Sequence, residues 1–227
     1  MLKGAVFDLD GTITVLTLPL DAMREDAKAY FVSQGLPPEM LEPADGISSS
    51  TLKAKKYFRQ QGGSEEEWAR MMRELDEVLN QHEGHAAEDV RLIEGAFDAV
   101  DQVRAMGLRT AILTNNGRHA VDIVLKNVPL DDYFDVIQTR NESPNPKPYP
   151  DGILLVVEKL ELFLDEAIYI GDARIDGAAA QRAGIEFWGV TSGETHAEDL
   201  LKAGASRVFQ SLREIPEAIR ERNKSND

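Results

Sequence analysis

The sequence predicts an α/β fold, in which a parallel sheet lies between layers of helices and carries an inserted helical domain. Three observations lead to this fold class. Short continuous apolar runs recur along the chain, stretches with a helical pattern of apolar residues lie between them, and roughly a hundred residues separate the first two runs. Continuous apolar runs are typical of parallel strands that are buried on both faces. Their alternation with helices favours an open sheet with right-handed crossovers.

The strands are predicted from the apolar runs, and the helices from the spacing of apolar residues between those runs. The runs are Gly4–Asp8, Arg109–Leu113, Val136–Ile137, Ala167–Ile170 and Phe187–Val190. The helical patterns are Phe97, Val100 and Val103; Ala120, Ile123 and Val124; Ile153, Leu154 and Val157; and Ala178, Ala179 and Ala180.

The long segment between the first two strands is predicted to be a helical cap domain. One helical pattern there is Leu20, Met23, Ala27 and Tyr30, and another is Trp68, Met71, Met72, Leu75, Val78 and Leu79. Ser64 and Glu67 form a capping-box pattern just before the second of these. We therefore predict a core domain over residues 1–14 and 90–227 and a cap domain over residues 15–89.

Charge and cysteine content exclude several classes of function. The chain has 40 acidic and 25 basic residues and a net charge of -15, so its overall field repels nucleic acid, and an anionic substrate needs a local positive group such as a metal ion or a buried lysine. The absence of cysteine excludes disulfides, thiolate zinc sites and a cysteine nucleophile.

No segment resembles a membrane anchor or a secretion signal. The longest apolar stretch, Ile153–Val157, is far shorter than the roughly 20 residues of a membrane helix. The N-terminus leads directly into the first strand and lacks the longer apolar region of a signal peptide. We therefore predict a cytoplasmic protein without a membrane partner.

The strongest local motif, Asp8-Leu9-Asp10-Gly11-Thr12, lies where the first strand ends. Ligands of open α/β sheets bind outside the carboxyl ends of the strands. In extended chain, side chains two positions apart point the same way, so both carboxylates are expected to face one small volume. A turn with solvated acidic residues is the alternative interpretation of this motif alone.

Two further motifs follow later strands. Thr114-Asn115-Asn116 precedes a predicted helix, where a hydroxyl and backbone amides can bind a phosphate, although a plain helix cap has the same pattern. Asn145–Pro150 holds Lys147 among three prolines. Such a loop fixes a cation rigidly, although a solvent-facing linker also fits this composition.

The last motif, Gly171–Gly177, follows the fourth strand and contains Asp172 and Asp176. Asp172 lies at the strand end and Asp176 one helical turn later, so both can face the same crevice. Carboxylates of this kind suit magnesium, which usually takes one or two of them together with a substrate phosphate. A helix cap with an acidic first turn is the alternative.

Together the four motifs supply the groups that phosphoryl transfer uses: carboxylates for a metal, a hydroxyl, backbone amides and a lysine. Their order resembles the haloacid dehalogenase-like (HAD) hydrolase superfamily, and specifically its phosphoglycolate phosphatase and beta-phosphoglucomutase-like branch with a helical cap. The resemblance spans essentially the whole chain and implies a Rossmann-like core with the cap after the first strand.

The resemblance implies a mechanism in two steps. Asp8 is the nucleophile that forms an aspartyl phosphate. Asp10 protonates the leaving oxygen and then deprotonates the attacking water. Mg²⁺ is held by the carboxylates of Asp8 and Asp172 and by the backbone carbonyl of Asp10. Asp176 lies behind these ligands and orients either the metal-bound waters or Lys147.

The resemblance also implies the groups that bind the phosphoryl oxygens. Thr114 and the backbone amide of Asn115 hold these oxygens, and Lys147 offsets the negative charge around Asp8 and the phosphate. The expected reaction is hydrolysis of a small phosphorylated metabolite such as phosphoglycolate or a sugar phosphate, by a monomer or homodimer.

Three other functions share parts of this pattern. A phosphomutase would pass the phosphoryl group to a sugar hydroxyl instead of water, and the four motifs do not separate it from a phosphatase. A haloacid dehalogenase does not need a general acid at Asp10. A phospho-aspartate signalling switch would leave the cap domain without a role.

Overall fold

The computed structural model describes residues 1–224 of the chain. The chain divides into two compact units. One unit contains residues 1–17 and the chain from residue 89 onward, and the other contains residues 18–88. The division into a core domain of residues 1–14 and 90–227 and a cap domain of residues 15–89 stays a prediction.

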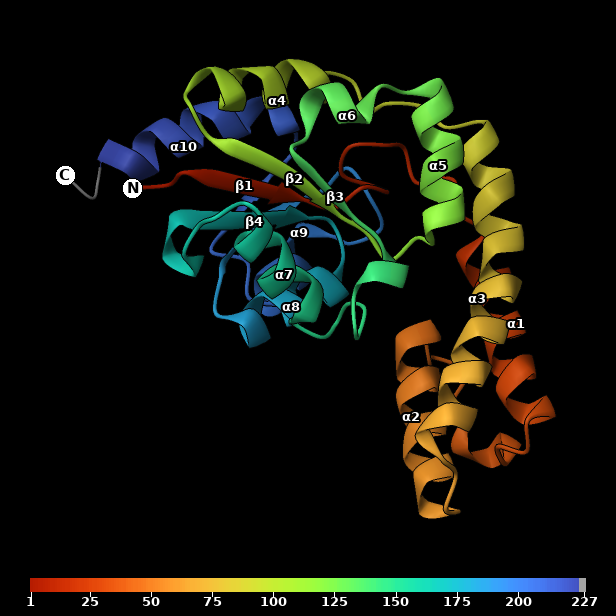
Figure 1. Ribbon diagram of the computed structural model, residues 1–227. Coiled ribbons are helices and arrows are strands. Elements are labelled where there is room, and N and C mark those ends of the chain that lie inside the picture. Colours follow the sequence, from red (N-terminus) through yellow and green to blue (C-terminus); the bar gives the residue numbers. More distant parts are fainter. Residues whose placement is uncertain (225–227) are drawn as a thin grey trace. The chain divides into compact units, whose positions relative to one another are not determined.

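The first unit is built on a six-stranded sheet in the order β3-β2-β1-β4-β5-β6 (Figure 1). The strands are β1 (Gly4–Phe7), β2 (Arg109–Leu113), β3 (Val136–Gln138), β4 (Ala167–Gly171), β5 (Glu186–Val190) and β6 (Arg207–Phe209). All neighbouring strands are parallel, which confirms the predicted fold class. The register places Phe7 beside Ile112 of β2 and Ile170 of β4, so these three strands end at one level.

Helices cover both faces of this sheet, because each connection between parallel strands crosses over one face in a right-handed sense. They are α4 (Ala96–Ala105), α5 (Arg118–Asn127), α6 (Leu130–Tyr133), α7 (Asp151–Lys159), α8 (Arg174–Ala183), α9 (Ala197–Lys202) and α10 (Ile215–Lys224). Helices α4 and α10 lie on one face, and α7 and α8 lie on the other (Figure 1). Short 3-10 helices span Arg140–Glu142, Leu164–Glu166 and Leu212–Glu214.

The core of this unit explains why the strands read as continuous apolar runs. Val6, Ala111 and Tyr169 point from three adjacent strands into one buried cluster, and Ile153 and Ala179 meet them from α7 and α8. Side chains that are buried on both faces of a sheet leave no room for polar alternation. Strand β6 was not predicted, because it is a half-buried edge strand without such a run.

The second unit is wholly helical. It contains α1 (Leu20–Ser33), α2 (Ile47–Gln60), α3 (Glu65–Glu88) and a 3-10 turn at Pro38–Met40. Phe31, Met23 and Leu75 lie in its own hydrophobic core. The Ser64–Glu67 capping box forms as predicted, with the Glu67 amide donating to Ser64 Oγ at 3.1 Å and the Ser64 amide donating to Glu67 Oε2 at 2.8 Å.

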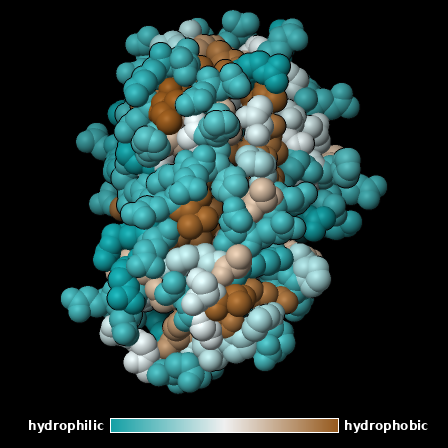
Figure 2. Space-filling model, turned by 90° about the vertical axis from the view of Figure 1, so that its right-hand side faces the viewer, coloured by the Kyte–Doolittle hydropathy of each residue, from teal (hydrophilic) through white to brown (hydrophobic). Residues whose placement is uncertain are grey.

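One face of the molecule is mainly polar (Figure 2). The face drawn in Figure 2 is mostly hydrophilic, and its hydrophobic residues form small separate groups. Within residues 1–224, no helix is both long and apolar enough to cross a membrane. The cytoplasmic location stays a prediction.

Candidate active site

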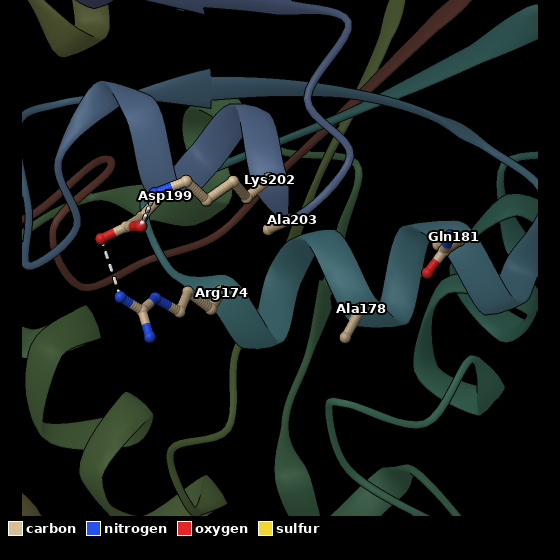
Figure 3. Close-up of a pocket in the computed structure, with 6 residues that line it drawn as sticks. All are labelled: Arg174, Ala178, Gln181, Asp199, Lys202 and Ala203. Atoms are coloured by element: carbon tan, nitrogen blue, oxygen red, sulfur yellow. Dashed lines mark hydrogen bonds and ion pairs between the residues drawn. The ribbon is translucent and has the colours of Figure 1, made fainter.

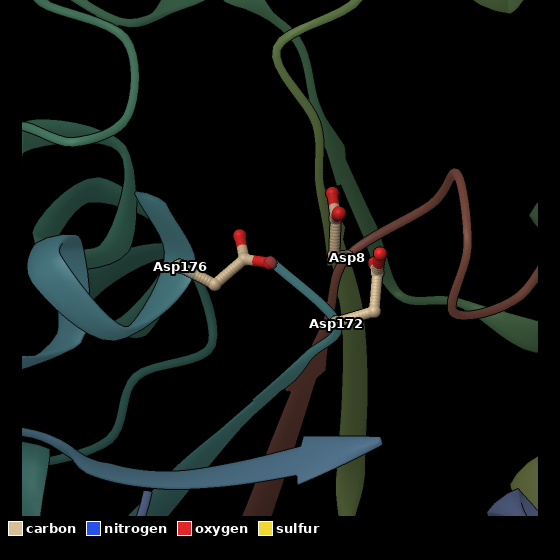
Figure 4. A group of neighbouring side chains, drawn as sticks. All are labelled: Asp8, Asp172 and Asp176. Carbon is tan, nitrogen blue, oxygen red and sulfur yellow. The ribbon is translucent and has the colours of Figure 1, made fainter. Parts of the chain in front are cut away.

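Three carboxylates meet beyond the carboxyl ends of β1 and β4. Asp8 directly follows β1, Asp172 follows the neighbouring strand β4, and Asp176 lies in the first turn of α8. Each offers an oxygen within 4.8 Å of those of the other two. Figure 4 shows Asp8 and Asp172 side by side, with Asp176 facing them from α8. The parallel pairing of β1 with β4 therefore brings together residues that lie far apart in the sequence.

A buried lysine joins this cluster. Lys147 is only 3% exposed, and its Nζ donates to Asp8 Oδ1 at 2.6 Å and to Asp176 Oδ1 at 2.7 Å. It also donates to the Tyr169 hydroxyl at 3.0 Å and lies 3.3 Å from the Leu113 carbonyl oxygen. The lysine in the proline-rich loop is thus a paired cation of the site and not a solvent-facing linker residue.

The loop that carries Lys147 is fixed by a side chain from the loop after β2. The side chain of Asn115 donates from Nδ2 to the Lys147 carbonyl oxygen and accepts at Oδ1 from the Lys147 amide, both at 2.9 Å. These two hydrogen bonds resemble the pairing of neighbouring strands. Asn115 therefore positions the lysine, a role that its predicted use as a phosphate contact did not include.

Burial and charge shift the pKa values of the cluster. The pKa of Asp8 is raised well above its usual range, because burial and the charge of Asp176 outweigh the attraction of Lys147. Burial, together with Asp176, raises the pKa of Asp172 to about 7. The pKa of Lys147 is also raised, since the carboxylates of Asp176 and Asp8 overcome the opposing effect of burial. Three buried carboxylates against one lysine leave an excess of negative charge that favours a cation.

The surroundings of Asp172 suit a metal ligand. Thr12 Oγ1 donates to its Oδ1 at 3.1 Å, and the Glu194 amide donates to its Oδ2 at 3.1 Å. Gly11 and Gly193 pack so closely that a Cβ at Gly193 would lie 1.8 Å from Asp172 Oδ2. The chain thus fixes this carboxylate from two loops. Clustered oxygen donors with excess negative charge fit a hard divalent cation such as Mg²⁺.

Asp10 has different partners from Asp8. Strand β1 ends at Phe7, and the backbone then turns so that the amides of Ile13 and Thr14 donate to the Leu9 carbonyl. Asp10 Oδ2 accepts from Asn116 Nδ2 at 2.6 Å, and Asp10 Oδ1 accepts from Thr14 Oγ1 at 3.3 Å. That both carboxylates face one small volume stays a prediction.

Thr114 lies directly beyond β2 and before α5, at the same edge of the sheet. It is 2% exposed, and its Oγ1 accepts from the Asn116 amide at 3.0 Å. The Thr114 amide donates to the Gln138 carbonyl at 3.0 Å, which extends the hydrogen bonding between β2 and β3 by one residue. The structure therefore places all four sequence motifs at one edge of the sheet.

Comparisons with known proteins support this arrangement. The family model for haloacid dehalogenase-like hydrolases matches residues 5–190, a range that contains all four motifs. The chain belongs to this family. The phosphoglycolate phosphatase of Shigella sonnei is 26% identical over 96% of this chain and 92% of its own.

Solved structures share the fold of this HAD-like hydrolase. A hydrolase from Pseudomonas syringae is 26% identical, with a TM-score of 0.66 over 96% of this chain and 98% of its own. A protein from Thermotoga maritima, provisionally named a beta-phosphoglucomutase, is 22% identical, with a TM-score of 0.62 over 97% of this chain and 99% of its own.

Sequence reasoning missed two contributors to the site of this HAD-like hydrolase. The Tyr169 hydroxyl accepts from Lys147 Nζ at 3.0 Å and donates to Asp176 Oδ1 at 3.1 Å. In the sequence, Tyr169 lies in an apolar run and cannot be distinguished from an aromatic residue of the core. The loop after β5 supplies the Glu194 amide and the close approach of Gly193. The pair of small residues Ser192 and Gly193 at a strand end was the available signal.

A surface pocket elsewhere on the first unit is a separate feature. Its volume is about 300 Å³, and it is lined by residues of α8, α9 and the position after α9. The lining residues are Arg174, Ala178, Gln181, Asp199, Lys202 and Ala203 (Figure 3). None of the acidic cluster lines it, and Asp199 pairs there with Arg174 and Lys202. The pocket is therefore not the candidate active site.

Proposed function

We propose that this HAD-like hydrolase is a Mg²⁺-dependent phosphatase that hydrolyses a small phosphorylated metabolite, such as phosphoglycolate or a sugar phosphate. The observation that carries the proposal is the buried Lys147, which is paired with Asp8 and Asp176 beside Asp172. A carboxylate nucleophile next to a fixed cation is suited to attack on an anionic phosphate. The name of the Shigella sonnei relative supports the substrate class.

Asp8 is the proposed nucleophile. Its carboxylate attacks phosphorus, an oxygen–phosphorus bond forms, and the bond from phosphorus to the leaving oxygen breaks. Lys147 binds Asp8 Oδ1 and offsets negative charge while the aspartyl phosphate forms. Splitting hydrolysis into two steps replaces one difficult reaction with two easier ones.

Asp10 is the proposed general acid and base. It gives its proton to the leaving oxygen in the first step. In the second step it takes a proton from the attacking water, whose oxygen bonds to phosphorus while the bond between phosphorus and the Asp8 oxygen breaks and inorganic phosphate leaves. A positioned group of this kind accelerates a reaction by about 10² to 10⁴. Its half-buried position beside the turn after β1 leaves it accessible to water.

The proposed Mg²⁺ ligands are the carboxylates of Asp8 and Asp172 and the backbone carbonyl of Asp10. The ion supplies positive charge for the transferring phosphoryl group. Asp176 has other partners: Lys147 and Tyr169 bind its Oδ1, and the Ala173 amide binds its Oδ2 at 3.0 Å. This supports a role for Asp176 in orienting the lysine and not the metal waters.

Thr114 and the amide of Asn115 are the proposed contacts for the phosphoryl oxygens. The loop that carries them precedes α5, and donors at a helix N-terminus favour anions. Losing one such preorganised donor typically costs about 3 to 4 kcal/mol of transition-state stabilisation.

The test is turnover of p-nitrophenyl phosphate by Asp8→Asn. We expect activity to fall by about a thousandfold or more, because the amide is not a nucleophile. The circular dichroism spectrum should not change. Asp199→Asn is the matched control, since Asp199 pairs with surface cations outside the site. Unchanged activity in Asp8→Asn excludes Asp8 as the nucleophile.

Metal dependence is tested with EDTA. We expect the chelator to abolish activity and excess Mg²⁺ to restore it, because the excess negative charge of the cluster otherwise opposes an anionic substrate. Activity that persists after exhaustive chelation counts against the metal in this proposal.

A phosphomutase is the second candidate, and the provisional name of the Thermotoga maritima protein favours it. Product analysis with a hexose 1-phosphate separates the two reactions. Release of inorganic phosphate supports the phosphatase, and an isomerised sugar phosphate supports the mutase.

A further inference from the structure

We propose that Asn116 is the positioning residue for Asp10, and that its side-chain amide decides which carboxylate oxygen of Asp10 handles the proton. This inference rests on the proposed function, in which Asp10 is the general acid and base. The observation is the hydrogen bond from Asn116 Nδ2 to Asp10 Oδ2 at 2.6 Å. It joins the loop after β2 to the loop after β1.

Asn116 is rigidly held at its own end. It is 8% exposed, its backbone amide donates to Thr114 Oγ1 at 3.0 Å, and its carbonyl accepts from the Arg140 amide at 3.0 Å. A buried residue with both backbone groups bonded presents its side chain in a defined direction. The amide is therefore a fixed reference point for the more exposed Asp10.

Helix capping does not account for this side chain. The N-cap residue of α5 is Gly117, and the Arg118 amide in the first turn donates to Asn141 Oδ1 at 2.7 Å, not to Asn116. Asn is common at helix starts because its side chain accepts from backbone amides. Here the side chain of Asn116 donates instead, to a carboxylate that is 106 positions away in the sequence.

The two oxygens of Asp10 have chemically different partners. An amide nitrogen only donates, so Asp10 Oδ2 acts as an acceptor throughout. The Thr14 hydroxyl, 3.3 Å from Asp10 Oδ1, can donate or accept. Asp10 Oδ1 can therefore carry a proton and keep its hydrogen bond with the Thr14 hydroxyl, which then accepts. Asp10 Oδ2 holds the carboxyl group to Asn116.

The same short segment also contains the proposed phosphate contacts. Thr114, Asn115 and Asn116 are consecutive, and the Asn116 amide is bonded to the Thr114 hydroxyl. The orientation of the acid is thus set by the segment that holds the phosphoryl oxygens. A small displacement of a catalytic group lowers rates strongly, since the reacting atoms must be aligned.

The experiment compares two substrates in Asn116→Ala and Asn116→Asp. One is p-nitrophenyl phosphate, whose leaving group departs readily as an anion. The other is an alkyl phosphate, chosen from phosphoglycolate and hexose phosphates as the one that the wild type hydrolyses fastest. Its alkoxide needs a proton to depart. The measured quantity is kcat/KM, which covers all steps up to release of the alcohol.

We expect kcat/KM for the alkyl phosphate to fall by about 10- to 100-fold in both variants, because a misdirected acid loses part of its catalytic contribution. For p-nitrophenyl phosphate we expect a change of less than about threefold, since that leaving group needs little acid catalysis. Asn116→Asp keeps the side-chain shape but cannot donate when ionised, so it tests the donor if Asn116→Ala unfolds. Asn127→Ala, at an exposed position of α5, is the control.

Equal losses on both substrates overturn the proposal, because they indicate a general role in structure or phosphate binding. Unchanged values on both substrates overturn it as well. Asp10→Asn provides the separate check: it should show the same selectivity for the alkyl phosphate, but to a larger extent. If Asp10→Asn shows no such selectivity, or the wild type hydrolyses neither substrate, the proposed function fails, and this inference fails with it.

Discussion

Replacing Lys147 by methionine tests the charge balance of the site. Lys147 is the cation that contacts Asp8 and Asp176, at 2.6 and 2.7 Å, and its side chain is 2% exposed. Methionine has a similar length and no charge. The variant therefore leaves the acidic cluster almost as well packed but without its lysine.

The expected loss of stability follows from the two contact distances. At an effective dielectric constant of about 20, each pair attracts by about 6 kcal/mol. Burying the ammonium group costs several kcal/mol, so only part of this attraction stabilises the fold. Removing one partner of a buried pair typically costs about 3 to 5 kcal/mol, since the other charge remains buried. For a chain of this size we expect a fall in Tm of about 6 to 20 °C.

Thermal and urea unfolding at pH 8 in EDTA measure this loss. The double variant Lys147→Met with Asp176→Asn removes one charge of each sign, and we expect it to recover a large part of the stability. Lys126→Met, an exposed lysine on α5, should change stability by less than about 0.5 kcal/mol. A loss below about 1 kcal/mol in Lys147→Met, or a double variant as unstable as the single one, refutes the charge argument.

The other predictions concern pH and the loop after β5. The pKa of Asp172 is about 7 in the folded protein, against an ordinary value of 3.8. Between these two pH values the folded protein therefore binds more protons than the unfolded chain. Without metal, the contribution of Asp172 to stability falls as pH rises from about 4 to about 7. Urea unfolding in EDTA at several pH values between about 4 and 7 measures this fall in stability. A stability that rises with pH over the upper half of this range contradicts the prediction, because carboxyls with a lowered pKa, such as Glu142, change stability only at more acid pH. We also expect Gly193→Ala to weaken Mg²⁺ binding by about 10- to 100-fold, since the new Cβ would displace the Asp172 carboxylate. Calorimetric titration with Mg²⁺ tests this against Gly46→Ala, whose Cβ meets nothing within 4 Å, and equal affinities would refute it.

The parts of the fold that the sequence predicted are those set by burial. Strands β1 and β4 are buried throughout, and β2 is buried except at Arg109, so each appears in the sequence as an apolar run. The edge strand β6 is half-buried and carries no such run, which is why it was missed. The alternation of strands and helices predicts a parallel sheet, but it does not give the order of the strands.

The positions of the site residues were predictable for a similar reason. Asp8, Thr114 and Asp172 each follow a parallel strand, and such strands end at one edge of a sheet. Hydrogen-bond partners were not predictable, because they depend on side-chain conformations that only the packed structure fixes. The sequence left open whether Asp176 orients Lys147 or metal-bound waters, and in the structure Lys147 Nζ donates to Asp176 Oδ1 at 2.7 Å.

The double hydrogen bond between Asn115 and the backbone of Lys147 has a consequence for how the site tolerates change. A side-chain amide that mimics a strand ladder links two surface loops whose lengths would otherwise vary independently. Residues added to either loop can bulge outward while these two hydrogen bonds keep the spacing between the loops, so the Lys147 ammonium group stays beside Asp8. The Asn115 side chain thus fixes the spacing between the two loops. In an Asn115→Asp variant of the same size, the atom that faces the Lys147 carbonyl changes from a donor to an acceptor, so one of the two hydrogen bonds is lost.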